Sequence, residues 1–228
     1  MRRTAAVLVA LGAVLAGCGS TGGDSGEVSA RETTTASTTP APAPVGGQID
    51  PAGYESPEAL AAESPLVVLG AVVAWEKGPR VVLDDGSTRG EPEQWDYTVL
   101  ILAVDHVVKD EQGLATGDRI SIAVPDTAAT LSALAPVGAN VAFVGGAESG
   151  LSMFEGDQYE VTDPDAGVAE GTTLLWASPQ GVVLETATGA LVHADPAARD
   201  AVWKDVAGLP AEEQFGMVAQ RLTALARG

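Results

Sequence analysis

The chain has 228 residues, and 31 acidic residues against 12 Lys and Arg give it a formal net charge of −19. So acidic a surface repels nucleic acid and anionic headgroups, and we therefore expect no nucleic-acid partner. The single cysteine, Cys18, excludes an internal disulfide, so the fold has to depend on its hydrophobic core.

The first 17 residues have the features of an export signal. Arg2 and Arg3 precede an apolar run over residues 5–16, which leads through Leu15-Ala16-Gly17 into Cys18. A positive start, a short apolar segment and small residues before the cleavage point are typical of such a signal. As a helix the apolar run would span about 18 Å, too short for a hydrocarbon core of about 30 Å. We therefore interpret residues 1–17 as a signal peptide.

Leu15-Ala16-Gly17-Cys18 closely resembles the lipobox of bacterial lipoproteins. The resemblance implies that the Cys18 thiol takes a diacylglycerol, that the signal is cut just before Cys18, and that Cys18 becomes the acylated N-terminus. It implies a lipid anchor in the cell membrane and a protein on the extracytoplasmic face. Composition rich in Ala, Gly, Val and Asp favours a high-GC Gram-positive bacterium. Loss of Arg2 and Arg3 lowers the formal charge from −19 to −21.

Residues 18–56 are predicted to be a disordered tether. They are mostly Gly, Ser, Thr, Ala and Pro, and such a segment buries too little apolar surface to offset its ordering entropy. A flexible coil of this length would hold the next segment about 30–40 Å from the membrane. Because this exceeds the Debye length of about 8 Å, an acidic domain can stand near an anionic membrane without strong repulsion.

Residues 57–228 are predicted to form a single β-rich domain. The predicted strands are β-branched or alternating apolar segments bounded by turn formers, and they cover residues 66–75, 80–83, 95–108, 119–124, 141–145, 158–162, 172–178, 182–186 and 190–193. Turns are expected at residues 77–79 and 179–181, where Gly and Pro occur, and Gly70 indicates a bulge or bend.

Helices are predicted near both ends of this domain and between two strands. They cover 57–62, which follows the capping residue Ser56, then 127–134, then 197–207, which follows Asp195 and Pro196. A last helix starts at Pro210, and its Phe215, Val218, Leu222 and Leu225 form one stripe. The C-terminus is thus helical over about 196–227. The fold class is a β-rich α+β fold, with a small OB-like barrel or an antiparallel meander and C-terminal helices.

The strand over residues 95–108 carries apolar side chains on both faces, as expected for a long strand that coils within a small barrel. Residues 66–73, Tyr97-Thr98-Val99, residues 117–122 and Val141-Ala142-Phe143 are similar in order and spacing to netrin-like domains. That group includes the tissue inhibitors of metalloproteinases. The resemblance implies an OB-like barrel with a packed C-terminal helix. The resemblance does not imply inhibition of metalloproteinases, because this sequence lacks the inhibitors' disulfides and their free N-terminal cysteine.

Residues for chemistry are few. His106 and His193 lack the spacing that would place two metal ligands on one helical face, and we expect both on the surface or at strand ends. We expect no metal, no cofactor and no catalytic residue. Trp95 and Tyr97 lie in a strand, where they either pack in the core or at the barrel rim, or form a patch for a ligand or partner.

These observations favour a non-catalytic, membrane-anchored lipoprotein whose domain binds an envelope protein or a small ligand. Two alternatives stay open. A secreted hydrolase using an Asp/Glu pair would need two carboxylates roughly 5–10 Å apart in a cleft. A carrier of an apolar ligand would need a cavity of at least about 300 Å³.

Overall fold

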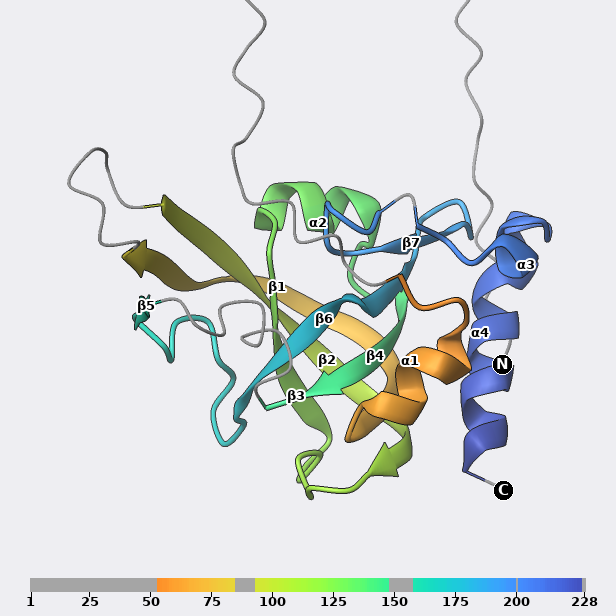
Figure 1. Cartoon of the computed structure of the whole chain (residues 1–228), viewed down its shortest axis with the longest axis horizontal. Coiled ribbons are helices and arrows are strands. Elements are labelled where there is room, and N and C mark those ends of the chain that lie inside the picture. Colours follow the sequence, from red (N-terminus) through yellow and green to blue (C-terminus); the bar gives the residue numbers. More distant parts are fainter. Residues whose placement is uncertain (1–52, 85–92, 148–157, 200, 227–228) are drawn as a thin grey trace, which may run out of the picture. The chain divides into compact units, whose positions relative to one another are not determined.

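The computed structural model describes residues 53–84, 93–147, 158–199 and 201–226. The predicted signal peptide, Cys18 and the predicted tether as far as residue 52 lie outside these ranges. The elements in chain order are α1 (Pro57–Glu63), β1 (Leu66–Asp84), β2 (Glu93–Asp110), β3 (Arg119–Val124), α2 (Ala128–Leu134), β4 (Asn140–Gly146), β5 (Gln158–Thr162), β6 (Leu174–Glu185), β7 (Leu191–His193), α3 (Lys204–Ala207) and α4 (Ala211–Leu225) (Figure 1).

Five of the strands close into a ring in the order β1–β2–β3–β6–β4, and β4 pairs again with β1. All pairs in the ring are antiparallel except β3 with β6, which is parallel. Closure leaves no open edge within the ring itself. The predicted β-rich α+β fold is confirmed, and of the two expected arrangements the structure has the small barrel. β5 and β7 pair outside the ring, with β1 and β6 respectively.

Side chains from alternate strand positions fill the interior of the ring. Leu100 and Leu102 of β2 meet Ile120 and Ile122 of β3 there, together with Phe143 of β4. All five are buried, and Phe143 is the largest fully buried side chain. Ile120, Ile122 and Val124 all point into the ring, as the alternation of residues 119–124 predicts. Ser121 and Ala123, which the alternation places on the outward face, are buried as well, because other parts of the domain cover that face. The ring is therefore a packed core.

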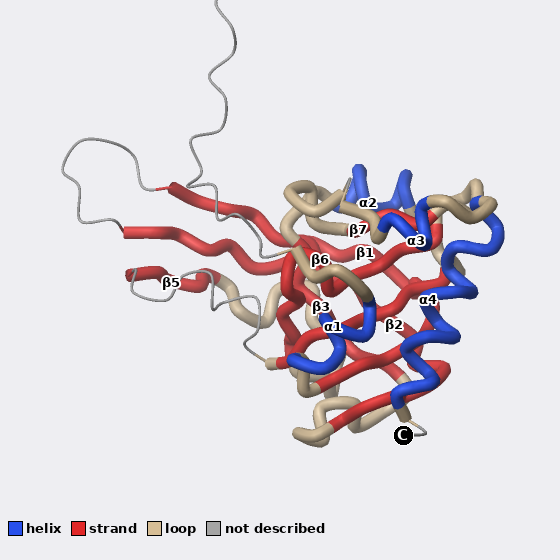
Figure 2. Tube along the Cα trace, turned by 45° about the vertical axis from the view of Figure 1, so that its right-hand side comes forward, coloured by secondary structure: helices blue, strands red, loops and turns tan. Residues whose placement is uncertain are grey.

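The helices α1, α3 and α4 cover an outer face of the ring with a second apolar layer (Figure 2). Phe215, Val218 and Leu222 of α4 are buried in this layer, as their helical spacing predicts. Leu225 was expected to continue the stripe, but it is 43% exposed. Because it lies in the last turn of α4, the helix has passed the edge of the layer at that point.

Arg221 of α4 forms ion pairs with acidic residues of both α1 and α3. Its Nε and Nη2 donate to the two carboxylate oxygens of Glu58 in α1, at 2.5 and 2.6 Å. Its Nη1 donates to Asp205 in α3. The Arg221 hydrogen bond holds the pKa of Glu58 below its usual range. A bidentate pair of this kind fixes the orientation of one helix on another.

The first turns of α1 and α2 are both capped, and the cap of α1 is the one that the sequence predicts. Ser56 precedes α1 and its hydroxyl accepts a hydrogen bond from the Ala59 N–H at 3.2 Å, with Pro57 at the first helical position. Thr127 precedes α2 and accepts from the Thr130 N–H at 3.2 Å. In each case a side-chain oxygen satisfies an amide that has no partner within the helix.

The turn predicted at residues 77–79 is wrong, because β1 continues through it. Lys77 pairs with Thr98 and Arg80 pairs with Asp96, so the ladder to β2 resumes after a shift of register. Gly and Pro at this point form a bulge, which bends a strand without ending it. The predicted strands over 66–75 and 80–83 are thus two halves of one strand.

The turn predicted at residues 179–181 is wrong for the same reason. Ala177 of β6 pairs with Gly145, and Val182 pairs with Phe143, so both sides of the segment lie along β4. The extra residues bulge out of the ladder, and β6 remains one strand. A Gly and Pro signal locates an irregularity, and the neighbouring strand decides whether the chain reverses there.

The helix predicted over residues 197–207 is also wrong, except for its last turn, α3. The Asp195 carboxylate accepts from the Ala197 N–H at 2.7 Å. The Ala198 and Ala201 amides then donate three residues back, to the carbonyls of Asp195 and Ala198. These local bonds form successive tight turns in place of a continuous helix.

Gly70 is predicted to be indispensable to the ring. A register shift lies between Leu69 and Gly70, and a Cβ built on Gly70 would lie 1.9 Å from the Ala103 carbonyl oxygen. Gly70→Ala should therefore lower the free energy of unfolding by about 3 kcal/mol, as overpacking does. Denaturant unfolding of the full chain measures this.

The matched control is Gly216→Ala, at an exposed position of α4 where an added Cβ meets nothing within 4 Å. It should raise the free energy of unfolding by about 0.5–1 kcal/mol, the helix-propensity difference between Gly and Ala. Equal effects of the two substitutions would contradict the assignment of a close backbone contact at Gly70.

Candidate functional site

Three strands extend together beyond the ring, and we call this extension the arm. It comprises residues 80–84 of β1, residues 93–97 of β2 and residues 158–162 of β5. Figures 1 and 2 both show it on the side of the ring away from α3 and α4. Because β1 is paired on both of its sides there, the arm is a small sheet with two distinct faces.

One face of the arm is apolar. Residues directly opposite each other on antiparallel strands point to the same face. Val81 lies opposite both Trp95 and Val161, and Leu83 lies opposite Tyr159, so these five side chains share a face. Glu93 also lies opposite Leu83, so this exposed carboxylate stands at the outer end of the same face. Val81 is fully buried, whereas Tyr159 is 39% exposed. The face thus runs from the interior of the molecule to its surface.

The two aromatic residues singled out in the sequence, Trp95 and Tyr97, lie next to each other on this face. Tyr97 is 6% exposed, and its ring meets that of Trp176 edge-on with centroids 5.0 Å apart. Trp95 is half-buried and packs at the edge of the same cluster, which also contains Ala123. Tyr97 therefore packs in the buried cluster at the base of the arm, and Trp95 reaches the surface.

The other face and the ends of the arm are polar and acidic. Arg80 Nε donates to Asp96 Oδ1 at 2.6 Å across the strands, and this hydrogen bond lowers the pKa of Asp96. The exposed acidic residues on and beside the arm are Glu93, Asp96, Glu160, Asp163 and Asp165. Among the described residues of this region they outnumber the basic ones, Lys77 and Arg80.

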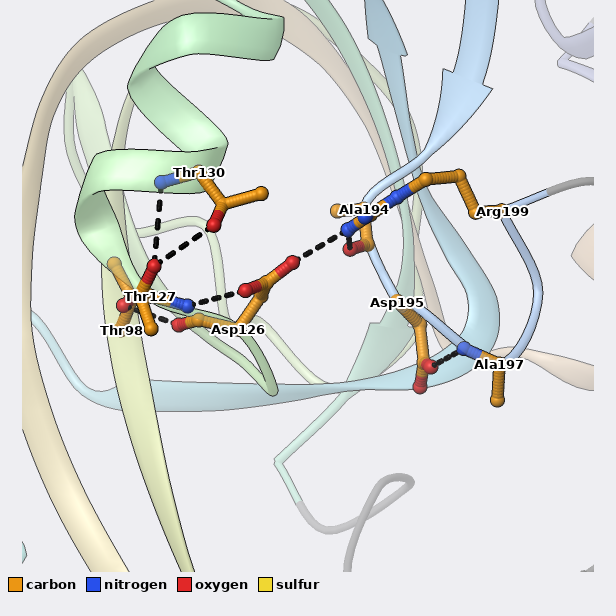
Figure 3. A network of polar contacts seen from close by, with 8 residues as sticks. All are labelled: Thr98, Asp126, Thr127, Thr130, Ala194, Asp195, Ala197 and Arg199. Atoms are coloured by element: carbon orange, nitrogen blue, oxygen red, sulfur yellow. Dashed lines mark hydrogen bonds and ion pairs between the residues drawn. The ribbon is translucent and has the colours of Figure 1, made fainter. Parts of the chain in front are cut away.

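A separate polar network surrounds Asp126, directly after β3 (Figure 3). One carboxylate oxygen accepts from the Thr127 N–H at 2.6 Å, and the other accepts from Arg199 Nη2 at 2.5 Å. The Asp126 carbonyl accepts from the Thr98 hydroxyl at 2.5 Å. The network joins β2, the start of α2 and the segment after β7, so its role is to hold these parts together.

Asp195 is a second carboxylate in this region. Burial raises its pKa, the Ala197 N–H and Arg199 oppose the rise, and the charge of Asp126 adds to it. Burial, with the charge of Asp195, also raises the pKa of the Tyr97 hydroxyl. Each Asp126 carboxylate oxygen accepts one hydrogen bond, as Figure 3 shows, and the two bonds together fix the orientation of this carboxylate.

Two shallow depressions lie elsewhere on the described surface. One, of about 230 Å³, is lined by Ala61, Ala62, Val108, Lys109 and Leu225 between α1, β2 and α4. The other, of about 240 Å³, lies between residues 116–119 and residues 169–172. Neither is lined by Asp126 or Asp195. The two carboxylates and the two depressions are therefore separate features.

The two histidines are in different surroundings. His106 is exposed on β2, whereas His193 ends β7 and is fully buried. The His193 ring meets the Trp203 ring edge-on at 5.0 Å, and neither of its nitrogens has a hydrogen-bond partner among the described residues. Burial lowers the pKa of His193 to about 4, although the backbones of Gln180 and Ala201 favour the charged ring. His193 is therefore a neutral core residue.

Within the described ranges, no three His, Cys, Asp or Glu side chains gather as a set of metal ligands. No helix in those ranges is both long and apolar enough to cross a membrane. Comparisons of the chain with protein-family models, with curated proteins and with solved structures found no match. The lipobox at residues 15–18 and the netrin-like resemblance stay predictions.

Several residues of the arm and of the Asp126 network could not be identified from the sequence. Asp126 and Arg199 are 73 positions apart, and no spacing rule relates them. Val161 and Tyr159 lie in a short strand whose pairing with β1 decides their face. Residues 80–83 are Arg-Val-Val-Leu and do not alternate, so the sequence does not show which of them share the apolar face of the arm.

Acid is predicted to destabilise the fold through His193. An unfolded histidine titrates near pH 6.5, whereas buried His193 has a pKa of about 4, so the unfolded state binds the proton first as the pH falls. This contribution to stability is complete above about pH 6.5 and is lost on going down to about pH 4, by up to about 3 kcal/mol. Urea unfolding at several pH values measures it.

His193→Phe should remove this component, and His106→Phe, at an exposed position, should leave it in place. Identical pH profiles for the His193→Phe variant and the wild type would contradict the role given to His193.

Proposed function

We propose that the chain is a lipoprotein anchored through Cys18 on the extracytoplasmic face of the cell membrane, and that its domain is a non-catalytic module that binds an envelope protein through the arm. The lipobox and the tether support the anchor. The apolar face of the arm carries the binding part of the proposal. Trp95 and Tyr159 lie where that face reaches the surface.

Trp and Tyr side chains at the surface are the residues that most often dominate protein–protein binding energy, because each buries a large rigid area. The arm holds them on a paired sheet, with β1 bonded to β2 on one side and to β5 on the other. A preformed surface of this kind loses little conformational freedom on binding. The arm therefore fits a folded protein partner better than a flexible ligand.

The charge of the arm indicates the character of the partner. Glu93 lies on the apolar face, Asp163 and Asp165 follow β5 beside it, and the chain as a whole is strongly acidic. Like charges across an interface slow the encounter and oppose binding, whereas opposite charges speed it. We therefore infer a partner with an apolar patch bordered by Lys and Arg.

The two alternatives have less support. Leu100, Ile122 and Phe143 are among the side chains that fill the ring, so its interior offers an apolar ligand no space. For a hydrolase that uses an acid pair, Asp126 is a weak candidate, because its carboxylate is hydrogen-bonded to the Thr127 N–H and to Arg199. A protein-binding module needs neither feature.

The anchor is tested by metabolic labelling with palmitate. The wild-type chain, expressed in a bacterium that processes lipoproteins, should incorporate the label, and Cys18→Ala should abolish it, because the thiol that takes the lipid is missing. Trp95→Ala, in the folded domain, should be labelled as well as the wild type. A wild-type chain without label would contradict the proposed anchor.

The binding surface is tested by photo-crosslinking in intact cells of the source bacterium. A photo-reactive residue in place of Glu93, which is exposed beside Trp95, should give a discrete protein adduct. The same residue in place of Met217, which is 36% exposed on α4, should not. Added salt should weaken the Glu93 adduct, because it screens the charges around the arm.

Trp95→Ala should reduce the Glu93 adduct at least about tenfold, the effect of losing a central aromatic anchor. Equal adducts from positions 93 and 217, or an adduct indifferent to Trp95→Ala, would contradict binding through the arm.

A further inference from the structure

Tyr54 lies at the end of the predicted tether, and it is built into the folded domain. Its backbone N–H donates to Gln180 Oε1 at 2.7 Å, and its carbonyl accepts from Trp203 Nε1 at 3.1 Å. Its hydroxyl donates to Glu63 at 2.9 Å. Tyr54 is thus held by β6, by the segment before α3 and by α1.

The two residues that hold the Tyr54 backbone are themselves fixed. Gln180 is 4% exposed and Trp203 is 3% exposed. Gln180 Nε2 donates to the Ala201 carbonyl at 3.3 Å, and the Trp203 ring packs against His193. If Tyr54 left, a buried amide oxygen and a buried indole N–H would lose these partners, which opposes its release.

Tyr54 and the arm lie at different parts of the domain. Tyr54 packs against the apolar layer formed by α1, α3 and α4, and the arm extends on the side of the ring away from α3 and α4 (Figures 1 and 2). The Gln180 contact is made at the bulge of β6, outside the arm strands. The chain therefore enters the domain on the helix-bearing side.

We propose that Tyr54 is a clasp that ends the tether on the helix-bearing side of the ring, so that the arm faces away from the membrane. This inference rests on the proposed lipid anchor at Cys18. A tether restrains its attachment point to the neighbourhood of the anchor, so the side of the domain that carries Tyr54 lies closer to the membrane on average than the opposite side. The partner then approaches the arm from the side opposite the membrane.

The clasp is tested by hydrogen exchange of the acylated full chain. The Tyr54 amide should exchange slowly, and Gln180→Met, which keeps the length of the side chain but not its hydrogen bonds, should speed this exchange at least about tenfold. Amides of β2 should keep their protection in both proteins. The control Tyr54→Phe loses only the hydroxyl contact with Glu63 and should exchange as slowly as the wild type.

Exchange of the wild-type Tyr54 amide at the rate of an unfolded peptide would overturn the clasp. Should Gln180→Met fail to fold, the wild-type rate alone still decides this point.

The orientation is tested by energy transfer to an acceptor lipid in phosphatidylcholine vesicles. Acylation blocks the Cys18 thiol, so Glu93→Cys and Met217→Cys each provide one site for a donor dye, on the arm and on α4 respectively. Transfer from position 217 should exceed transfer from position 93 by about 1.5-fold or more, given a tether that reaches about 30–40 Å.

Equal transfer from the two positions in a vesicle-bound chain would overturn the orientation. Failure of the chain to bind vesicles would instead overturn the lipid anchor, so the two proposals fail in different ways.

Discussion

The path of β1 is the constraint on which the rest of the structure depends. Five strands close into a ring only if some of them coil, and β1 does so through four shifts of register against β2. At one of them Gly70 brings the backbone so close to the Ala103 carbonyl that no side chain fits. The first half of β1 then pairs with β4 to complete the ring, and its second half pairs with β5 to build the arm. One strand thus both closes the core and projects the candidate binding surface.

Polar side chains in this domain serve chiefly to attach outlying segments to the ring. Arg199 ties the segment after β7 to Asp126, and Arg221 ties α4 to Glu58 in α1. Gln180 does the same for Tyr54. Each of these groups is engaged by a structural partner, and charge-assisted pairs of this kind specify geometry more than they add net stability. The surface that remains for recognition is the apolar face of the arm, with Glu93 at its outer end.

Local sequence signals predicted the helices and strands well where interactions between residues close in sequence determine them. The alternation of residues 119–124 identified β3 and the face that fills the ring, and Ser56 identified the start of α1. Gly and Pro signals were wrong at residues 77–79 and 179–181, because these residues occur in bulges as well as in turns. The sequence of residues 197–207 has a helical pattern. In the structure, however, the Asp195 side chain and short-range backbone hydrogen bonds form turns at the start of this segment in place of a helix.

The sequence by itself determined where the strands and most helices lie, which faces are apolar, and that the fold is β-rich with C-terminal helices. It also predicts the lipid address at Cys18, and it singled out Trp95 and Tyr97. Only the tertiary structure decided that β3 pairs in parallel with β6 and that parts of β1, β2 and β5 form one arm. It also decided that Tyr54 is hydrogen-bonded to Gln180 and Trp203, which lie more than a hundred positions further along the chain. The reason is physical. Propensity and periodicity act over a few residues, whereas strand partners and buried hydrogen bonds are selected by how distant apolar faces pack together.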